Sequence, residues 1–235
     1  MELKEKELFE YIYCPLRYKL LANGNSFNEQ KSFKKLCYEA INYYFNAKCN
    51  DLKADSSTLK RKWDSIASNN TTTLSPKKVL DGWGLLYRTY EYVNLYDIKF
   101  TAVNHPYNIE IPGTGVCLTG VLDPFIIKDD YIEIFITSFD KQMPERIDIE
   151  TKLKHTIDAY VIKKLYNKDV VINYYVPAQG KTIQTLRSTH DFEKFESIIK
   201  NVGKAISNNI IYPRETFMCS SCVARPICKS WTGQE

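Results

Sequence analysis

The sequence has no apolar run near the roughly 18 residues that a membrane-spanning helix needs, and no internal repeat or low-complexity tract. Its opening, MELKEKELFE, is too charged for a secretory signal. The net charge is only +4 over 235 residues, so charge alone does not indicate a polyanionic partner. With 44% hydrophobic residues, we expect one globular domain over 1–235, no membrane partner, and a cytoplasmic or other reducing compartment.

Seven cysteines, an odd number, do not suit a disulfide framework in such a compartment. Three of them lie in the stretch CSSCVARPIC, at positions 219, 222 and 228. Three thiols at this spacing are one short of a tetrahedral metal site. Structural thiols without a metal are the alternative. Single cysteines in apolar patterns are expected to be buried small side chains, and these are Cys37, Cys49 and Cys117.

Hydrophobic periodicity predicts a mainly helical region over residues 1–98, an α/β core over 99–208 and a cysteine segment over 209–235. The expected helices are 3–13, 29–47, 59–68 and 76–96, then 145–166 and 191–208. The expected strands are 99–111, 115–128 and 131–139 as an antiparallel meander, then 170–178 and 181–188. This order predicts a mixed α/β fold, with one central sheet of about five strands flanked by helices.

Several segments spread over nearly the whole chain share the pattern of a known family. They are YIYCPLRYKLL, NHPYNIEI followed by LTGVLDPF, YIEIFITSF, the helix with Tyr160, and the terminal C-x2-C-x5-C. The chain resembles PD-(D/E)XK nucleases of the RecB type. The resemblance is to the iron-sulfur branch, which includes a CRISPR-associated exonuclease, the AddB nuclease domain and mitochondrial single-strand exonucleases. It implies a restriction-endonuclease-like core and action on DNA.

In this family a cysteine of an N-terminal CP segment joins three C-terminal cysteines around a 4Fe-4S cluster. The resemblance therefore implies that Cys14 completes the set with Cys219, Cys222 and Cys228. Four thiolates are the ligands that such a cluster needs. A link across about 200 residues would also constrain the unfolded chain strongly. Zinc can use the same four thiolates, so the metal stays open between the cluster and zinc.

The family cuts phosphodiesters with Mg²⁺ or Mn²⁺ held on carboxylates of adjacent strands, and a lysine on the second strand assists. Asp123 in TGVLDPF matches the metal-binding aspartate, although a turn aspartate ahead of a proline is the alternative. The acidic-x-lysine motif is missing from the next strand. Its carboxylate would fall on residue 135 or 136 and its lysine on 137 or 138, where the chain reads Phe135, Ile136, Thr137 and Ser138.

Other family positions are altered as well. The family histidine falls near Tyr38, the first-strand glutamate is Asn104 beside His105, and the helix glutamine is Thr156 beside His155. A lone carboxylate holds Mg²⁺ weakly, because this ion requires several oxygen ligands. The charged residues that could replace the missing groups are Glu133, Asp140, Glu110 and Lys141.

We favour a degenerate nuclease fold kept as a nucleic-acid-binding or assembly module, with DNA as the expected partner and a larger complex as its setting. An active single-strand-directed exonuclease with relocated catalytic residues is the first alternative, and a zinc-stapled interaction protein is the second. Candidate phosphate contacts, which could equally be solvated charges, are Arg17, Lys19, Lys60, Arg61, Lys62, Lys77, Lys78, Lys152, Lys163 and Lys164. Candidate stacking rings are Tyr11, Tyr13, Tyr43 and Tyr44.

Overall fold

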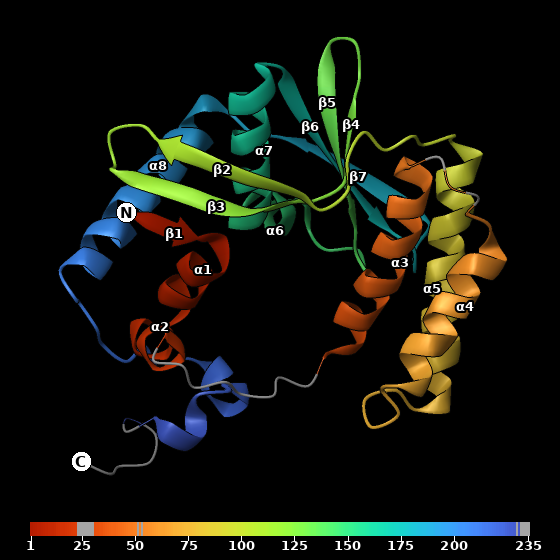
Figure 1. Ribbon diagram of the computed structural model, residues 1–235, viewed down its shortest axis with the longest axis horizontal. Coiled ribbons are helices and arrows are strands. Elements are labelled where there is room, and N and C mark those ends of the chain that lie inside the picture. The colour runs from red at the N-terminus through yellow and green to blue at the C-terminus, as the bar shows by residue number, and fades with distance from the viewer. Residues whose placement is uncertain (23–30, 51, 53, 229, 231–235) are drawn as a thin grey trace. The chain divides into compact units, whose positions relative to one another are not determined.

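The computed structural model describes residues 1–22, 31–50, 52, 54–228 and 230 (Figure 1). Its contacts divide the chain into two compact units, each built from separated segments. Unit 1 contains residues 1–29, 106–120 and 193–235, and unit 2 contains residues 30–105 and 121–192. A single domain over the whole chain stays a prediction. No helix in the described part is long and apolar enough to cross a membrane.

Unit 2 begins with three helices whose first turns are capped by side chains. Ser32, Asp55 and Ser75 each accept a hydrogen bond from the backbone N–H three residues later, which satisfies a donor that the helix leaves free. The helices are α3 (Phe33–Cys49), α4 (Ser56–Ser68) and α5 (Pro76–Leu95). They lie side by side (Figure 1). The expected start of the first of them, at Glu29, lies outside the described residues.

A four-stranded sheet forms the rest of unit 2, in the order β4-β5-β6-β7. The strands are β4 (Phe125–Ile127), β5 (Tyr131–Thr137), β6 (Asp169–Val176) and β7 (Lys181–Leu186). The helices α6 (Arg146–Glu150) and α7 (Leu153–Tyr166) lie between β5 and β6 in the chain. The β5–β6 pair is parallel and the outer pairs are antiparallel. A parallel pair needs a crossover connection, which α6 and α7 supply.

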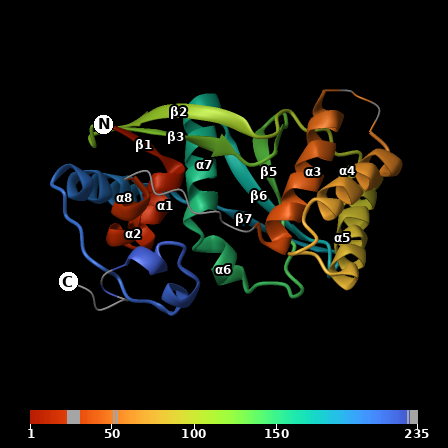
Figure 2. The ribbon, with the colours of Figure 1, turned by 60° about the horizontal axis from the view of Figure 1, so that its bottom comes forward.

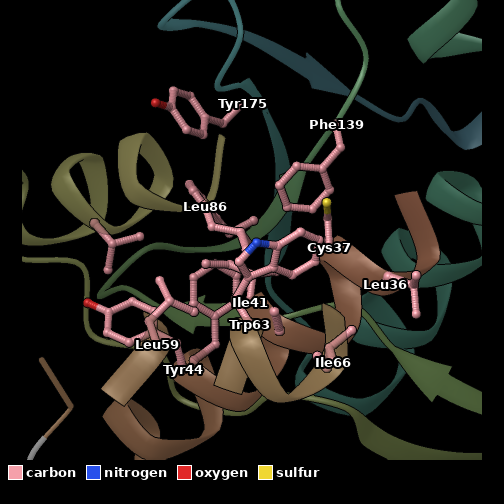
Figure 3. Packing of buried hydrophobic residues seen from close by; sticks show 14 of the residues in the cluster. Leu36, Cys37, Ile41, Tyr44, Leu59, Trp63, Ile66, Leu86, Phe139 and Tyr175 are labelled. Atoms are coloured by element: carbon pink, nitrogen blue, oxygen red, sulfur yellow. The ribbon is translucent and has the colours of Figure 1, made fainter. Parts of the chain in front are cut away.

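The main core of unit 2 lies between the three helices and one face of this sheet (Figure 3). Phe135 of β5 and Tyr175 of β6 point to this face and pack with Trp63, Tyr44 and other buried rings. Because side chains alternate along a strand, the neighbouring Ile136 and Tyr174 point to the opposite face. There Tyr174 contacts the ring of His155 on α7.

Unit 1 contains a three-stranded sheet in the order β1-β3-β2, with β1 and β3 parallel. Its elements are β1 (Glu2–Lys4), α1 (Glu5–Tyr13), α2 (Pro15–Ala22), β2 (His105–Ile111), β3 (Val116–Leu122), α8 (Thr189–Ser207) and two short 3-10 helices, η1 (Phe217–Ser221) and η2 (Arg225–Ile227). β2, β3 and α8 extend by a few residues into unit 2.

Within unit 1 the helices α1 and α2 lie beside the segment that follows α8 (Figure 2). The Tyr11 hydroxyl donates to the Ile210 carbonyl at 2.7 Å, and the Leu16 N–H donates to the Tyr212 carbonyl at 3.1 Å. The Arg214 guanidinium donates to the Ile12 carbonyl at 2.7 Å. These long-range bonds hold α1 and α2 against the segment that follows α8.

The mixed α/β class is confirmed, but the single sheet of about five strands is wrong. The expected strand 115–128 divides at Asp123–Pro124 into β3 and β4, which belong to different sheets. Proline has no N–H to donate to a sheet and restricts the residue before it, so the pairing stops there.

Three smaller expectations also fail. Residues 2–4 form a strand rather than the start of a helix, α2 was not expected, and the expected helix 145–166 divides into α6 and α7.

The packing of Trp63 against α5 gives a stability test. A Cβ atom on Gly82 would lie 2.8 Å from Trp63 Cη2 and closer still to Cζ2, whereas Gly84, on the same helix, has open space. Because Trp63 is fully buried and donates to the Val79 carbonyl at 3.0 Å, it has little room to move. We expect Gly82→Ala to lower the free energy of unfolding by about 1–3 kcal/mol, and Gly84→Ala to raise it by up to about 1 kcal/mol. Urea denaturation measures both changes, and equal effects of the two variants would contradict this account.

Candidate functional site

A cavity of about 390 Å³ lies around Asp123 in unit 2. The ends of β3 and β5, the middle of α3 and the start of α7 enclose it. We call it the Asp123 pocket and define it by Tyr38, Ile41, Asn42, Phe45, Asp123, Pro124, Phe135, Ile136, Thr137, Lys152, Lys154, His155 and Tyr174. It therefore gathers Asp123 and several positions where the resemblance implied catalytic groups.

Asp123 occupies the break between β3 and β4. The Phe135 N–H donates to the Pro124 carbonyl at 2.7 Å, which fixes this break against β5. The carboxylate is half-buried, and within the described residues no hydrogen bond or ion pair holds it. Asp123 thus lines the pocket with its oxygens available, and its role as a metal-binding aspartate stays a prediction.

The neighbouring strand supplies no second carboxylate and no lysine. Phe135 is fully buried, and Ile136 and Thr137 line the pocket beside it. Thr137 is only 4% exposed, and its Oγ1 finds no hydrogen-bond partner in the described part of the chain. A buried hydroxyl without a partner is costly, so this group is the unusual feature of the strand.

Two lysines at the start of α7 also face the pocket. Lys154 Nζ donates to the Val121 carbonyl at 2.8 Å and to Asp158 Oδ1 at 2.6 Å, so a carboxylate compensates its charge. Lys152 Nζ donates to the Tyr174 hydroxyl at 3.2 Å and lies 5.0 Å from the centre of that ring. The sequence placed Lys152 and other lysines of this helix among the phosphate contacts, and it named Thr137 only as a position where the lysine of the motif is missing.

Two other titratable groups of the pocket, His155 and Tyr38, are neutral near pH 7. Burial, followed by the positive charge of Lys152, lowers the pKa of His155 to about 4, and its Nδ1 lies 3.3 Å from the Ile149 carbonyl. Burial of its hydroxyl, followed by the neighbouring Tyr174 and Asp123, raises the pKa of Tyr38. Tyr38 thus remains a hydrogen-bond donor where the resemblance placed a histidine.

The carboxylates that could have replaced the missing ligand do not line this pocket. Glu133 accepts from Asn173 Nδ2 at 2.7 Å, and Glu110 belongs to unit 1. Asp140 accepts from Ser138 Oγ at 2.6 Å and pairs with Lys34. Although burial alone would raise the pKa of Asp140, its bonds with Lys34 and Ser138 give a net lowering. With Lys141, Asp140 lines a different cavity of unit 2.

These positions do not fit a nuclease metal site. Mg²⁺ and Mn²⁺ need several oxygen ligands, and one carboxylate facing a lysine supplies too few. No group of three or more His, Cys, Asp or Glu side chains in the described residues is arranged to hold a metal ion. The geometry of the pocket therefore supports no metal-dependent cleavage step.

A second cavity, in unit 1, is lined by Cys14, Cys219, Cys222 and Cys228. The backbone N–H of Arg214 donates to Cys14 Sγ, and that of Thr216 donates to Cys219 Sγ, each at 3.4 Å. All four thiols are half-buried. The structure thus brings the four expected cysteines to the lining of one cavity, but their thiols are not arranged around a single metal position. We call this the cysteine cavity.

The remaining cysteines line neither of these two cavities. Cys37 is buried as expected, and burial raises its pKa to about 12. Cys49 and Cys117 are half-buried rather than buried.

Most of the basic candidates have partners within their own unit. Arg17 pairs with Glu10 and lies over Tyr13, Lys60 pairs with Asp64, and Lys163 pairs with Asp169. The other contacts are Lys19 with Asn209, Arg61 with Thr58, Lys62 with Glu39 and the Tyr43 ring, Lys78 with the Thr73 carbonyl, and Lys164 with the Tyr160 ring.

Tyr11 and Tyr44 are buried, so the expectation that they stack on bases is wrong, while Tyr43 is 46% exposed.

The comparisons with known proteins support the fold. No protein-family profile and no curated protein matches the chain. Among solved structures, a provisionally assigned exonuclease from Eubacterium rectale is similar, with a TM-score of 0.60 and 12% identity over 94% of this chain and 86% of that chain. SSO0001 also aligns, over 91% of this chain and 94% of that chain at 12% identity, but its TM-score is only 0.39. The chain thus has a nuclease-like fold, whereas the iron-sulfur branch stays a prediction.

The low pKa of His155 predicts a dependence of stability on pH. The unfolded histidine, with a pKa of 6.5, binds a proton that the folded one, at about 4, does not. Stability is therefore fully present above pH 6.5 and falls as the pH decreases toward 4. Between pH 7 and pH 5 we expect His155 to account for a loss of about 2 kcal/mol. Denaturant unfolding of His155→Gln should lack this loss, and His190→Gln, an exposed control, should keep it. An unchanged pH slope in His155→Gln would contradict the prediction.

Proposed function

We propose that the protein is a nucleic-acid-binding module that keeps a nuclease fold but has lost the cleavage site, and that a metal held by four cysteines stabilises it. DNA is the proposed ligand, and a larger nucleic-acid-processing complex in a reducing compartment is the proposed setting. One observation carries the loss of cleavage. Asp123 faces Phe135, Ile136 and Thr137, where a metal-dependent nuclease needs a second carboxylate and a lysine.

Two separate lysine–ring contacts on the helices α3, α4 and α5 support the binding role. Lys60 of α4 lies 5.6 Å from the ring of Trp83 on α5, which packs on Tyr87. Lys62, on another side of α4, lies 5.4 Å from the ring of Tyr43 on α3. A lysine beside an accessible ring suits single-stranded nucleic acid, whose phosphates can compete with the exposed partners Asp64 and Glu39 while a base stacks on the ring.

The cysteine cavity supports the metal proposal. Cys14, Cys219, Cys222 and Cys228 would supply four thiolates, and the two backbone N–H groups that point at sulfur would stabilise their negative charge. A 4Fe-4S cluster or a zinc ion would act there as a cross-link between the two ends of unit 1. No reaction step depends on it.

A binding and cleavage assay tests the central proposal. We expect the protein to bind single-stranded DNA in EDTA, with an affinity that falls steeply as salt rises, and to cut neither single- nor double-stranded DNA with Mg²⁺ or Mn²⁺. Asp123→Ala should leave binding of long strands within about twofold, because one pocket contributes little to a many-contact electrostatic interface. The matched control is Asp129→Ala, which changes an exposed aspartate on the β4–β5 turn.

Cleavage by the wild type that Asp123→Ala removes and Asp129→Ala keeps would overturn the loss of catalysis. It would favour an active exonuclease with relocated ligands. Undetectable binding to both kinds of DNA would overturn the nucleic-acid role.

Metal content tests the cysteine proposal separately. Protein purified without oxygen should be brown with broad visible absorption if it holds a 4Fe-4S cluster, or colourless with one zinc per chain. In either case we expect Cys14→Ser to lose most of the metal, because one of four ligands is gone. Cys117→Ser should keep it, since Cys117 lies outside the cysteine cavity and contacts Asn108. Wild-type protein with neither iron nor zinc, measured by mass spectrometry, would exclude the proposed ligand set.

A further inference from the structure

We infer that the Asp123 pocket binds one nucleotide without a metal ion, with an amino group of the base toward Asp123 and the phosphate toward Lys152. The inference rests on the proposed function in taking nucleic acid as the ligand class. It replaces the lost cutting site with a recognition site.

The walls of the pocket suit a planar ring. Its volume of about 390 Å³ is in the range typical of small-molecule sites. The rings of Phe45, Phe135 and Tyr174 are buried along its sides, while Tyr38 is 37% exposed and can stack on a base. Polar side chains also converge on the pocket, and such groups fix the orientation of a ligand; they are Asn42, Asp123, Thr137, Lys152, Lys154 and His155.

Asp123 provides the acceptor for the base. Its half-buried carboxylate has no hydrogen bond or ion pair within the described residues, and it lacks the fellow carboxylates that a divalent cation needs. Carboxylates accept hydrogen bonds from the exocyclic amino group of cytosine. Uracil presents a carbonyl oxygen at the same position, so a carboxylate repels it.

Lys152 provides the cation for the phosphate. Asp158 already compensates the charge of Lys154, whereas no carboxylate in the described part of the chain forms an ion pair with Lys152. Charge-assisted hydrogen bonds from an ammonium to phosphate are strong. The pocket therefore presents one charged group of each sign that has no ion-pair partner among the described residues, as a nucleotide with an amino-bearing base and a phosphate requires.

Thr137 adds a second, independent observation. Its side chain is more than nine-tenths buried and lines the pocket, and its Oγ1 lacks a partner among the described residues. Buried polar groups in folded proteins nearly always have a hydrogen-bond partner. A ligand in the pocket supplies the missing one.

The test uses three small probes in EDTA, with NMR titration of the whole protein. We expect deoxycytidine monophosphate (dCMP) to bind roughly tenfold more tightly than deoxyuridine monophosphate (dUMP), which lacks the amino group. We also expect roughly a tenfold advantage of dCMP over deoxycytidine, which lacks the phosphate. A competition experiment then distinguishes the two sources of the nucleotide. Displacement of bound dCMP by a 5′-phosphorylated single strand indicates that the pocket binds a strand end, and no displacement indicates a free nucleotide.

Two variants assign each preference to one side chain. Asp123→Asn should abolish the difference between dCMP and dUMP, because an amide offers both a donor and an acceptor, while it keeps the phosphate advantage. Lys152→Gln should abolish the phosphate advantage and keep the base preference. Asp129→Asn and Lys200→Gln change exposed residues that do not line the pocket and should leave both preferences as in the wild type.

Several results would overturn the inference. They are no binding of dCMP at millimolar concentration, binding that requires Mg²⁺ or Mn²⁺, or preferences that Asp123→Asn and Lys152→Gln leave unchanged. If the wild type binds single-stranded DNA but not dCMP, only this inference fails. If it binds neither, the proposed function fails with it.

Discussion

The parallel pairing of β5 with β6 is the constraint on which the geometry of unit 2 depends. After β5 the chain must return to the start of β6 in the same direction, so it crosses over through α6 and α7. The first turn of α7 then lies at the end of β5 where Asp123 is found. Lys152 and His155 reach the pocket because of this connection and not because they belong to a motif.

The two cavities separate two kinds of chemistry. The cysteine cavity in unit 1 gathers four soft sulfur donors between the ends of the chain, whereas the Asp123 pocket in unit 2 contains hard oxygen and nitrogen groups. Soft donors suit iron-sulfur clusters or zinc, and a single carboxylate beside an ammonium suits neither those nor Mg²⁺. The two cavities share no lining residue, so the proposed metal cross-link and the proposed loss of the cutting site do not depend on each other.

The sequence predicts the features that depend on local patterns. Pro76 marks the start of α5, and the three- and four-residue spacing of Leu36, Ala40, Ile41 and Tyr44 marks the buried face of α3. The position of Asp123 also follows from its motif.

What the sequence missed depends on tertiary contacts. A three-residue strand such as β1 has no period to detect, and it exists because β3 pairs with it. The division of β3 from β4 required recognising that Pro124 ends one sheet rather than bending a strand. Nothing local shows that Thr137 Oγ1 lacks a partner, since this depends on what packs around β5. The Lys154–Asp158 pair, in contrast, spans four residues of α7 and follows from that spacing.

The discontinuity of unit 1 has a consequence for synthesis on the ribosome. β1 and α1 are translated long before Ile210 and Tyr212, which α1 and α2 contact. Unit 2 is complete once residue 192 has been translated. The nascent chain therefore carries an unfinished N-terminal segment while unit 2 folds, and unit 1 closes only afterwards. The apolar side chains of α1, such as Leu8, stay exposed to chaperones and proteases during that interval.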